Sequence, residues 1–358
     1  MNVEHCLVNE VDYLIVGQGL AGSLLACLFQ MRRNNVVVID NGHRTAASLS
    51  AAGIMNPITG KRLNRPFLID RLLEDAFTVY PKVERFLRAS FFRRRKVLRL
   101  LQSADELRQW KQRLASGDFA KYLGAIECPR FPSIENWFGG FEIALAGQLE
   151  VVAFIRRARE VFAAAGQLVE SEFDYNELRF SDNAVRWRDY TAKAVVFCEG
   201  YQMSKNPFFQ SIQLNPAKGE VLTLRAPHFS DDRIIQRGKW LFRSTSEEIK
   251  AGTTYSWDRL DENPTQVARD EIEQSIRQFA HFDFEVTNQT AGVRPVIRVD
   301  NRPIVGTHPE QRRVAILNGL GSKGVLQAPF ASIQLIGSLQ SGAPIHPDFD
   351  VCRKSLWP

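Results

Sequence analysis

The sequence predicts a mixed α/β protein, in which a parallel α/β domain is interrupted by a second domain built on an antiparallel sheet. An apolar stretch at residues 12–16 is followed at once by glycines and a helical stretch, and residues 35–40 then form a second buried-strand pattern. Such a strand–helix–strand unit implies a parallel sheet. Similar strand-and-glycine patterns return at residues 191–201 and 312–342. By contrast, residues 218–257 alternate between apolar and polar side chains, as antiparallel strands do.

Helices are predicted between these patterns, where apolar side chains recur at helical spacing, at residues 67–90, 104–116, 150–165 and 264–280. Residues 125–148 are rich in glycine, proline and aromatic side chains, which favours loops. Because the strand-and-glycine patterns stand at the start, middle and end of the chain, the α/β domain is expected to be discontinuous.

The length and composition are typical of a large globular protein. The chain has 358 residues, 44% of them hydrophobic, which is enough for the cores of two intertwined domains. No apolar stretch is long enough to span a membrane, and the first residues lack the apolar core of a signal peptide. A cytoplasmic protein is the simplest expectation.

Disulfide frameworks and metal sites are not expected. The five cysteines are odd in number, no two have CxxC spacing, and the six histidines are scattered. The formal net charge of +6 comes in part from two basic segments, residues 61–65 and 93–96. A basic patch can bind nucleic acid, anionic substrates or phosphate groups, although a solvated face explains so modest an excess more simply.

The clearest motif is the glycine-rich turn GQGLAG, directly after the first predicted strand. Gly17 permits a tight turn, Gly19 lets the backbone approach a pyrophosphate, and Gly22 lets the next helix pack close to the strand. The free N–H groups at the start of that helix favour phosphate binding. Asp40 ends the next predicted strand, where an acid can accept hydrogen bonds from the ribose of NAD or FAD. This context favours a dinucleotide site over an ordinary turn.

Two further stretches are suited to lie beside a bound cofactor. Residues 46–62 are small and polar up to Ile54, so their backbone can run close to a flat molecule, although a flexible loop would have the same composition. The glycine-rich residues 318–324 follow a predicted strand and precede a helix. A helix that begins near Gly324 directs its positive end toward whatever fills the turn, and Lys323 could add to that charge.

Residues 291–306, AGVRPVIRVDNRPIVG, hold three arginines in an otherwise strand-like stretch. Arg294 and Arg302 each precede a proline. These side chains could form salt bridges at the surface. Alternatively, one of them could bind an anionic ligand in a functional site.

The ordered set of motifs resembles the FAD-dependent D-amino acid oxidase superfamily, with a layout similar to those of glycine oxidase and sarcosine oxidase. The resemblance spans nearly the whole chain and is carried by VGQGLAGS, ID, SLSAAGIMNP, AKAVVFCEG, LNPAKGEVL, AGVRP, RPIVG and GLGSKGVLQAP. It implies a glutathione-reductase-type FAD-binding Rossmann domain with an inserted substrate domain built on an antiparallel sheet. The implied FAD-binding domain comprises residues 1–80, 140–206 and 292–358, and the substrate-binding domain comprises residues 81–139 and 207–291.

The resemblance also implies cofactor contacts. Leu20 and Ala21 would face the pyrophosphate, and Asp40 and Asn41 the adenosine ribose. The other FAD-binding residues that it implies belong to the glycine turn, the small-residue stretch, the adenine segment and the flavin loop: Gly17, Gly19, Gly22, Ala47, Ser48, Ala52, Gly53, Ile54, Phe173, Gly200, Leu320, Gly321, Ser322, Lys323, Gly324 and Val325.

The expected catalytic residues are Arg294, Trp240 and Lys323. Arg294 matches the arginine that binds a substrate carboxylate in glycine oxidase, and Trp240 falls where those enzymes place a substrate-facing tyrosine. A second substrate-facing arginine of glycine oxidase is replaced here by Ser322, and the adjacent Lys323 would either tune the flavin or contact the substrate. The other two arginines, Arg298 and Arg302, are expected to serve structure or solvent-facing pairs.

The implied reaction is oxidation of the C–N bond of an amino acid or secondary amine bearing a carboxylate, with hydride transfer to flavin. The electron acceptor would be oxygen or another molecule. No cysteine occurs in residues 291–306 or 318–330, so non-covalent FAD is expected. The GIMNPITGKR stretch is also similar to the oxidase half of a bacterial enzyme that modifies wobble uridines of tRNA. An enzyme acting on a modified tRNA base or another large anionic substrate is therefore an alternative, as is a flavin-binding protein without turnover.

Overall fold

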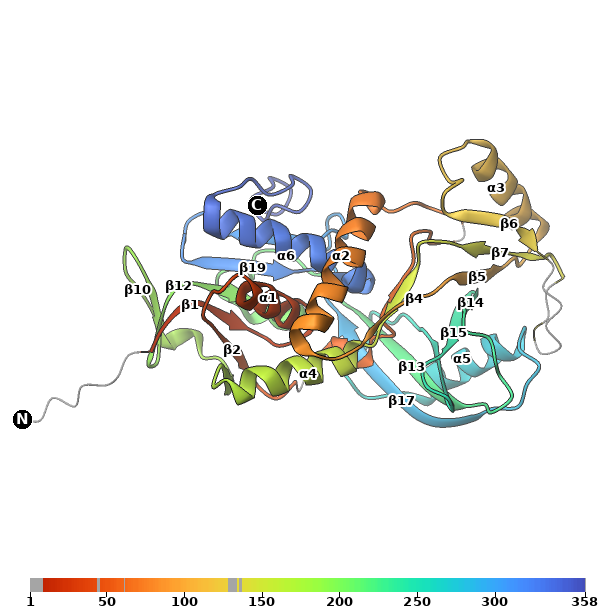
Figure 1. The fold of residues 1–358 in the computed structure, drawn as a ribbon, viewed down its shortest axis with the longest axis horizontal. Coiled ribbons are helices and arrows are strands. Elements are labelled where there is room, and N and C mark those ends of the chain that lie inside the picture. Colours follow the sequence, from red (N-terminus) through yellow and green to blue (C-terminus); the bar gives the residue numbers. More distant parts are fainter. Residues whose placement is uncertain (1–8, 44–45, 61, 128–133, 135–136, 358) are drawn as a thin grey trace, which may run out of the picture.

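The computed structural model describes residues 9–43, 46–60, 62–127, 134 and 137–357. The chain forms an elongated molecule with two lobes (Figure 1). One lobe is a mostly parallel sheet covered by helices, and the other is a curved, mostly antiparallel sheet with the same number of strands. The mixed α/β architecture predicted from the sequence is confirmed.

The first sheet is built around the two long strands β1 (Asn9–Val16) and β12 (Tyr190–Phe197), which pair in parallel. The strand order is β10-β11-β12-β1-β2-β9, and β19 pairs with both β12 and β18. The remaining strands of this sheet are β2 (Val36–Asp40), β9 (Leu168–Glu170), β10 (Leu178–Phe180), β11 (Val185–Trp187), β18 (Ile304–Thr307) and β19 (Val314–Asn318).

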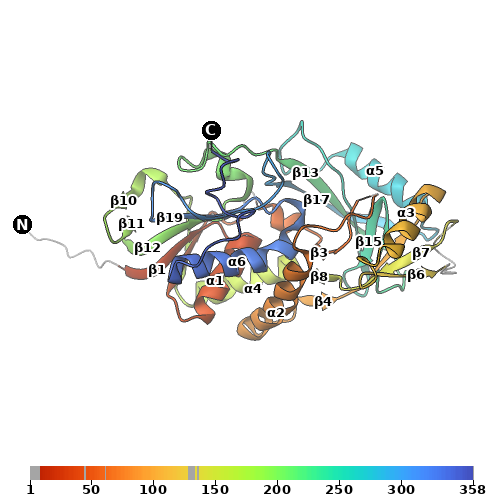
Figure 2. The ribbon, with the colours of Figure 1, turned by 90° about the horizontal axis from the view of Figure 1, so that it is seen from above.

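Helices cover one face of this sheet, where α1, α6, α2 and α4 are stacked together (Figure 2). Helix α1 has no solvent-exposed face from Leu20 to Phe29, because all these residues are buried between the sheet and the neighbouring helices. This explains why its sequence is mostly apolar rather than amphipathic. The helices of this layer are α1 (Leu20–Met31), α2 (Ile69–Leu87), α4 (Val151–Ala164) and α6 (Gly324–Ser341).

The second sheet forms the other lobe, in the order β17-β13-β16-β15-β14-β5-β7-β6. Its pairs are antiparallel, as predicted, except that β14 and β5 run parallel. Helices α3 (Ala104–Ala115) and α5 (Gln266–Arg277) belong to this lobe. Its strands are β5 (Val97–Leu100), β6 (Leu123–Glu127), β7 (Gly140–Ile143), β13 (Ala217–Arg225), β14 (Ile234–Arg237), β15 (Lys239–Arg243), β16 (Glu248–Gly252) and β17 (Glu285–Arg294).

The loop prediction for residues 125–148 is wrong in part. That stretch contains the end of β6, all of β7, and the start of β8 (Gly147–Leu149), which forms a small third sheet with β3 (Ile54–Met55) and β4 (Phe92–Arg94). A side chain at Gly147 would lie 3.1 Å from the Arg93 carbonyl oxygen, so the glycine serves close strand pairing rather than a turn. In addition, β7 pairs within the second sheet, although the predicted boundary at residue 140 places it in the FAD-binding domain.

Strand β17 connects the two lobes. It starts at the edge of the second sheet and ends at Arg294, directly before the chain returns to the first lobe. The short helix η1 (Ala47–Ser50) packs against it, because Gly292 has no side chain: a Cβ there would lie 2.9 Å from the Cα of Ala47. Residues distant in sequence therefore meet at the junction of the lobes.

Within the part of the chain that the structure describes, no helix is both long enough and apolar enough to cross a membrane.

Candidate active site

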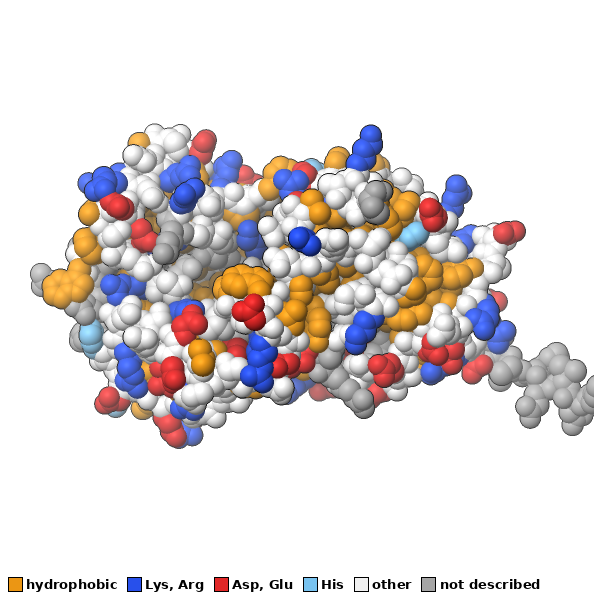
Figure 3. Space-filling model, turned by 180° about the vertical axis from the view of Figure 1, so that it is seen from behind, with side chains coloured by type: hydrophobic (Ala, Val, Ile, Leu, Met, Phe, Trp, Pro, Cys, Tyr) orange, Lys and Arg blue, Asp and Glu red, His pale blue; other side chains and the backbone are white. Residues whose placement is uncertain are grey.

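A cavity of about 830 Å³ lies between the two lobes. It begins at the carboxyl ends of the parallel strands and reaches the face of the antiparallel sheet, and Figure 3 shows the surface hollowed in this region. In α/β folds, ligands bind at the carboxyl ends of the strands, and this volume is within the usual range for cofactor sites.

The glycine turn after β1 forms a tight, pre-shaped wall of the cavity. Gly17 has φ of +95°, and a Cβ there would lie 2.6 Å from the Cys198 carbonyl oxygen. A Cβ on Gly22 would overlap the Gly17 carbonyl oxygen, so each glycine is required by its contacts. The N–H of Leu20 donates to Ser48 Oγ at 3.0 Å, which ties the start of α1 to η1. A close backbone approach at a helix N-terminus fits the pyrophosphate of a dinucleotide.

Asp40 lies at the end of β2, as predicted, and is almost completely buried. Its Oδ1 accepts hydrogen bonds from the N–H groups of Gly42 at 3.0 Å and His43 at 2.9 Å, and from Arg159 at 3.2 Å. Its Oδ2 accepts from the Gln18 N–H at 2.9 Å. The carboxylate is therefore held in place by these hydrogen bonds. A ribose hydroxyl that binds to Oδ2 would have to share this oxygen with the Gln18 N–H.

Aromatic side chains form the end of the cavity beyond Asp40. Phe173 stacks on Trp187 with ring centres 5.1 Å apart. Tyr175 packs edge-to-face against Phe173, with ring centres 5.4 Å apart. Tyr175, in η2 (Tyr175–Glu177), and Gly200, which begins η3 (Gly200–Lys205), also line this end. Flat apolar walls of this kind suit an adenine ring.

The loop before α6 borders the opposite end of the cavity. It contains η4 (Gly321–Lys323), and the N–H of Gly321 donates to the Pro295 carbonyl at 3.0 Å, so the loop is tied to the end of β17. Lys323 is half-buried, and burial lowers the pKa of its amine. In the part of the chain that the structure describes, this ammonium forms no ion pair.

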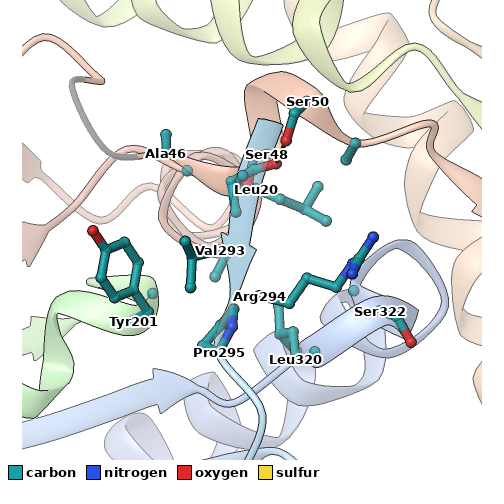
Figure 4. Close-up of a pocket in the computed structure, with 18 of the residues that line it drawn as sticks. Leu20, Ala46, Ser48, Ser50, Tyr201, Val293, Arg294, Pro295, Leu320 and Ser322 are labelled. Atoms are coloured by element: carbon teal, nitrogen blue, oxygen red, sulfur yellow. Dashed lines mark hydrogen bonds between the residues drawn. The ribbon is translucent and has the colours of Figure 1, made fainter. Parts of the chain in front are cut away.

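Arg294 extends from the end of β17 into the cavity, with Ser322 and Leu320 on the loop nearby (Figure 4). Its Nη2 donates to the Thr253 hydroxyl at 2.8 Å, and its guanidinium carbon lies 4.5 Å from the centre of the Tyr255 ring. No ion pair joins this guanidinium to a described Asp or Glu side chain. Burial lowers the pKa of Arg294, yet guanidinium stays protonated in proteins.

Trp240 forms an aromatic wall on the antiparallel sheet. It pairs across the strands with Gly252, where a Cβ would lie 2.9 Å from the indole ring, so the glycine makes room for it. Nearby, the Asn56 amide donates to Gln236 Oε1 at 3.2 Å, and both side chains line the cavity. This end of the cavity thus combines the Arg294 guanidinium, the rings of Trp240 and Tyr255 and an amide pair, with Lys323 on the adjacent loop.

Comparison with known proteins agrees with this geometry. Residues 12–335 match the DAO family, described as FAD dependent oxidoreductase. The chain belongs to this family. It is 23% identical to the glycine oxidase of Geobacillus kaustophilus over 359 residues, which cover 91% of this chain and 92% of that protein. Over a shorter match it is 27% identical to the tRNA 5-methylaminomethyl-2-thiouridine biosynthesis bifunctional protein MnmC of Marinobacter nauticus. That match covers 45% of this chain and 29% of the bifunctional protein.

Solved structures share the fold of this DAO-family protein. The iminodiacetate oxidase of Chelativorans superposes with a TM-score of 0.78 at 20% identity, covering 97% of this chain and 98% of that one. The Geobacillus glycine oxidase structure gives a TM-score of 0.79 at 19% identity with the same coverage of both chains. A glutathione-reductase-type FAD domain is consistent with these matches, and the protein is an FAD-dependent oxidoreductase enzyme.

The structure brings nearly all the predicted site residues of this oxidoreductase to the one cavity. Gly22 is the exception, because it packs behind the turn against Gly17. Arg298 and Arg302 do not line the cavity: Arg298 donates to Gln213, and Arg302 pairs with Asp348. The predicted residues in the cavity wall are Gly17, Gly19, Leu20, Ala21, Asp40, Asn41, Ala47, Ser48, Ala52, Gly53, Ile54, Phe173, Gly200, Trp240, Arg294, Leu320, Gly321, Ser322, Lys323, Gly324 and Val325.

Sequence reasoning missed several residues of the cavity wall. Asn56 lies in a stretch whose small residues and family resemblance do not single it out, and Gln236 lies in an alternating stretch. Tyr255 follows the end of β16 in an irregular segment. The acid Glu199, at the carboxyl end of a predicted parallel strand, carried a recognisable signal, because such strand ends form binding sites.

Proposed function

We propose that the protein oxidises the C–N bond of an amino acid or secondary amine that bears a carboxylate. The observation that carries this proposal is the Arg294 guanidinium, which faces the cavity without a described counter-ion. Buried charges are normally paired, so a half-buried cation of this kind needs an anionic ligand. A carboxylate matches the planar guanidinium in a two-point contact that fixes direction as well as distance.

The protein's contribution is to position the substrate. Arg294 would hold the carboxylate, and Trp240 would form the wall against which the substrate carbon chain packs. When bound, FAD would supply the redox chemistry, as acceptor of a hydride from the carbon next to nitrogen. The imine product then reacts with water to give a carbonyl compound and an amine. Because positioning dominates, displacing the reacting carbon by about 1 Å could cost on the order of 100-fold in rate.

The part of the cavity beside Arg294 offers little acid–base machinery, which supports this type of reaction, because the described acids Asp40, Glu172 and Glu199 line the other end. Of the described residues that line the cavity, His43 is the single histidine, and its ring nitrogen contacts the Gln18 carbonyl oxygen at 3.0 Å, at the Asp40 end. Loss of hydride needs the nitrogen lone pair, so the amine must react in its neutral form. The rate should therefore rise with pH toward the pKa of the substrate amine.

An anaerobic screen of flavin bleaching tests the proposal directly. Candidate substrates are amino acids, N-methylated amino acids and opines, each compared with the matched amine that lacks the carboxylate. We expect rapid loss of the visible flavin absorbance with a carboxylate-bearing amine and little with its decarboxylated partner. Equal bleaching by both members of every pair would contradict the role of Arg294, and bleaching by none would contradict the reaction.

Non-covalent FAD is part of the same proposal. The residues that would hold it include no described cysteine except Cys198, which is buried and follows β12. Acid precipitation of the purified yellow protein should release all its FAD to the supernatant. Flavin that stays with the pellet would contradict non-covalent binding. The electron acceptor, oxygen or another molecule, would be identified by reoxidising the reduced enzyme under air.

A second candidate function is oxidation of a modified tRNA base. Two observations favour it: the partial similarity to the tRNA-modifying bifunctional protein, and the position of one basic segment. Thr59 and Gly60 line the cavity, and the chain continues into the exposed Arg62 and Arg65, whereas Lys61 lies outside the described residues. If this candidate is right, tRNA should bind with an affinity that falls steeply with salt, and should bleach the flavin.

A further inference from the structure

A carboxyl group that the proposed reaction does not use lies in the cavity wall, after the end of the central strand β12. Glu199 lines the cavity, and its Cα is 3.4 Å from the position that a Cβ on Gly17 would occupy. It is therefore directly beside the glycine turn, and Gly200 follows it at the start of η3. This is the edge of the parallel sheet at which dinucleotides bind.

Two neutral side chains fix the carboxyl group of Glu199. The Tyr175 hydroxyl donates to its Oε1, and the Asn206 amide donates to its Oε2 at 2.7 Å. Asn206 is fully buried, and its own Oδ1 accepts from the Phe208 N–H at 2.9 Å, which fixes the orientation of the amide. In the part of the chain that the structure describes, no cation pairs with Glu199.

Burial raises the pKa of Glu199 to about 7, although its two hydrogen bonds act in the opposite direction. The titratable groups in contact with it are neutral in the same range: burial and the charge of Glu199 raise the pKa values of the Tyr175 hydroxyl and the Cys198 thiol. In η3, burial and a hydrogen bond to Glu262 raise the pKa of Tyr201 to about 12.

The other charged side chains among the described residues at this end of the cavity do not neutralise Glu199, and one of them, Glu172, is itself an exposed acid. Lys205, at the end of η3, is exposed at the edge of the cavity. Asp40, at the end of the neighbouring strand β2, is engaged by Arg159 and by backbone N–H groups. Glu199 is thus a carboxyl group with uncharged partners, in a wall where a dianionic pyrophosphate would lie.

We propose that Glu199 is an FAD-binding residue that acts as a neutral carboxylic acid. With FAD in the cavity Glu199 keeps its proton and its O–H donates a hydrogen bond to an oxygen of the nucleotide, while the carboxyl oxygens accept from Tyr175 and Asn206. An ionised carboxylate in this position would be repelled by the pyrophosphate, so binding favours the protonated form. The inference concerns the cofactor, and it stands whether or not the proposed substrate is correct.

The pH dependence of FAD binding follows from this assignment. Below the pKa of Glu199 in the free protein, the carboxyl group is protonated with and without FAD, so affinity does not change with pH. Above it, binding must take up a proton, and affinity falls as pH rises, by up to about tenfold per pH unit.

The test is the dissociation constant of FAD, measured from the fluorescence of FAD released when the holoenzyme is diluted at a series of pH values on either side of neutrality. We expect the dissociation constant of the wild-type protein to increase with pH once the pH exceeds about 7. The dissociation constant of Glu199→Gln should not change with pH, so this variant should retain FAD at high pH. Glu172→Gln is the matched control, because Glu172 is an exposed carboxylate at the same end of the cavity. It should keep the wild-type slope.

Equal slopes in wild type and Glu199→Gln would overturn the proposal, as would a folded Glu199→Gln protein that fails to bind FAD at every pH. If Glu199→Gln does not fold, Tyr175→Phe provides the test. The Tyr175 hydrogen bond lowers the pKa of Glu199, so its loss should move the onset of FAD release to higher pH. An onset that does not move would overturn the assignment.

Discussion

The guanidinium carbon of Arg294 lies 4.5 Å from the centre of the Tyr255 ring, so the aromatic face holds one side of the charged group. Thr253, two residues earlier, accepts a hydrogen bond from Nη2 at 2.8 Å. The same short segment therefore fixes both the plane of the guanidinium and its rotation. Nη1 also donates to the Thr254 carbonyl oxygen, at 3.4 Å. The N–H groups that these two bonds do not use can bind a ligand, which makes Arg294 a pre-oriented anion site rather than a flexible surface charge.

Arg294→Ala should raise the KM for a carboxylate-bearing substrate while leaving the flavin spectrum unchanged. The variant loses charge-assisted hydrogen bonds worth roughly 2 to 4 kcal/mol, or about 30- to 1,000-fold in kcat/KM. Arg294→Lys keeps the charge but not the planar fork, and it should recover only part of the loss. The measurement is steady-state kinetics with the best substrate from the bleaching screen. Normal turnover by Arg294→Ala would rule out this residue as the anchor.

Gly219→Ala should also weaken substrate binding, because the added side chain would displace Arg294. A Cβ on Gly219 would overlap the guanidinium of Arg294, so the side chain would have to leave its contacts with Thr253 and Tyr255. We expect a higher KM with FAD content unchanged. Gly337→Ala in helix α6 is the matched control, because its added Cβ would make only an ordinary contact, 3.5 Å from Ala343. If Gly219→Ala has wild-type KM, the observed guanidinium position is not the one that binds substrate.

The position of the residues at the glycine-turn end of the cavity could be predicted because it depends on local rules. A glycine turn after a buried strand, an acid at the next strand end, and a helix that begins at Gly324 each have a physical reason that sequence alone contains. The structure places Gly17, Asp40 and the start of α6 as expected.

The end of the cavity around Arg294 could be predicted only in part, because it is assembled from strand register and long-range packing. The neighbours of Arg294 come from residues 253–255, and the wall at Trp240 depends on Gly252 across the sheet. The spacing of these residues along the chain does not predict that they are in contact. The loop prediction for residues 125–148 is wrong in part for a similar reason, since Gly140 and Gly147 serve strand pairing that only the tertiary structure reveals.

Lys323→Met distinguishes the two roles left open for this lysine. If the ammonium stabilises the negative charge of reduced flavin, its loss should make the reduction potential more negative and weaken sulfite binding by the oxidised flavin. Lys205→Met is the control, since Lys205 is an exposed lysine at the opposite end of the cavity. A rise in KM with an unchanged potential would instead assign Lys323 to the substrate.

Trp240 should limit the size of the substrate, because its indole ring fills the space above Gly252. Trp240→Phe removes part of that wall, so amines with a bulkier substituent should gain in kcat/KM relative to small ones. Gly252→Ala acts in the opposite sense: its Cβ would lie 2.9 Å from the indole and push it toward the cavity, so small substrates should be favoured. The comparison is the ratio of kcat/KM for a small and a bulky substrate, because a general loss of stability lowers both values and leaves their ratio unchanged. A ratio that shifts in the same direction in both variants would mean that Trp240 does not face the substrate.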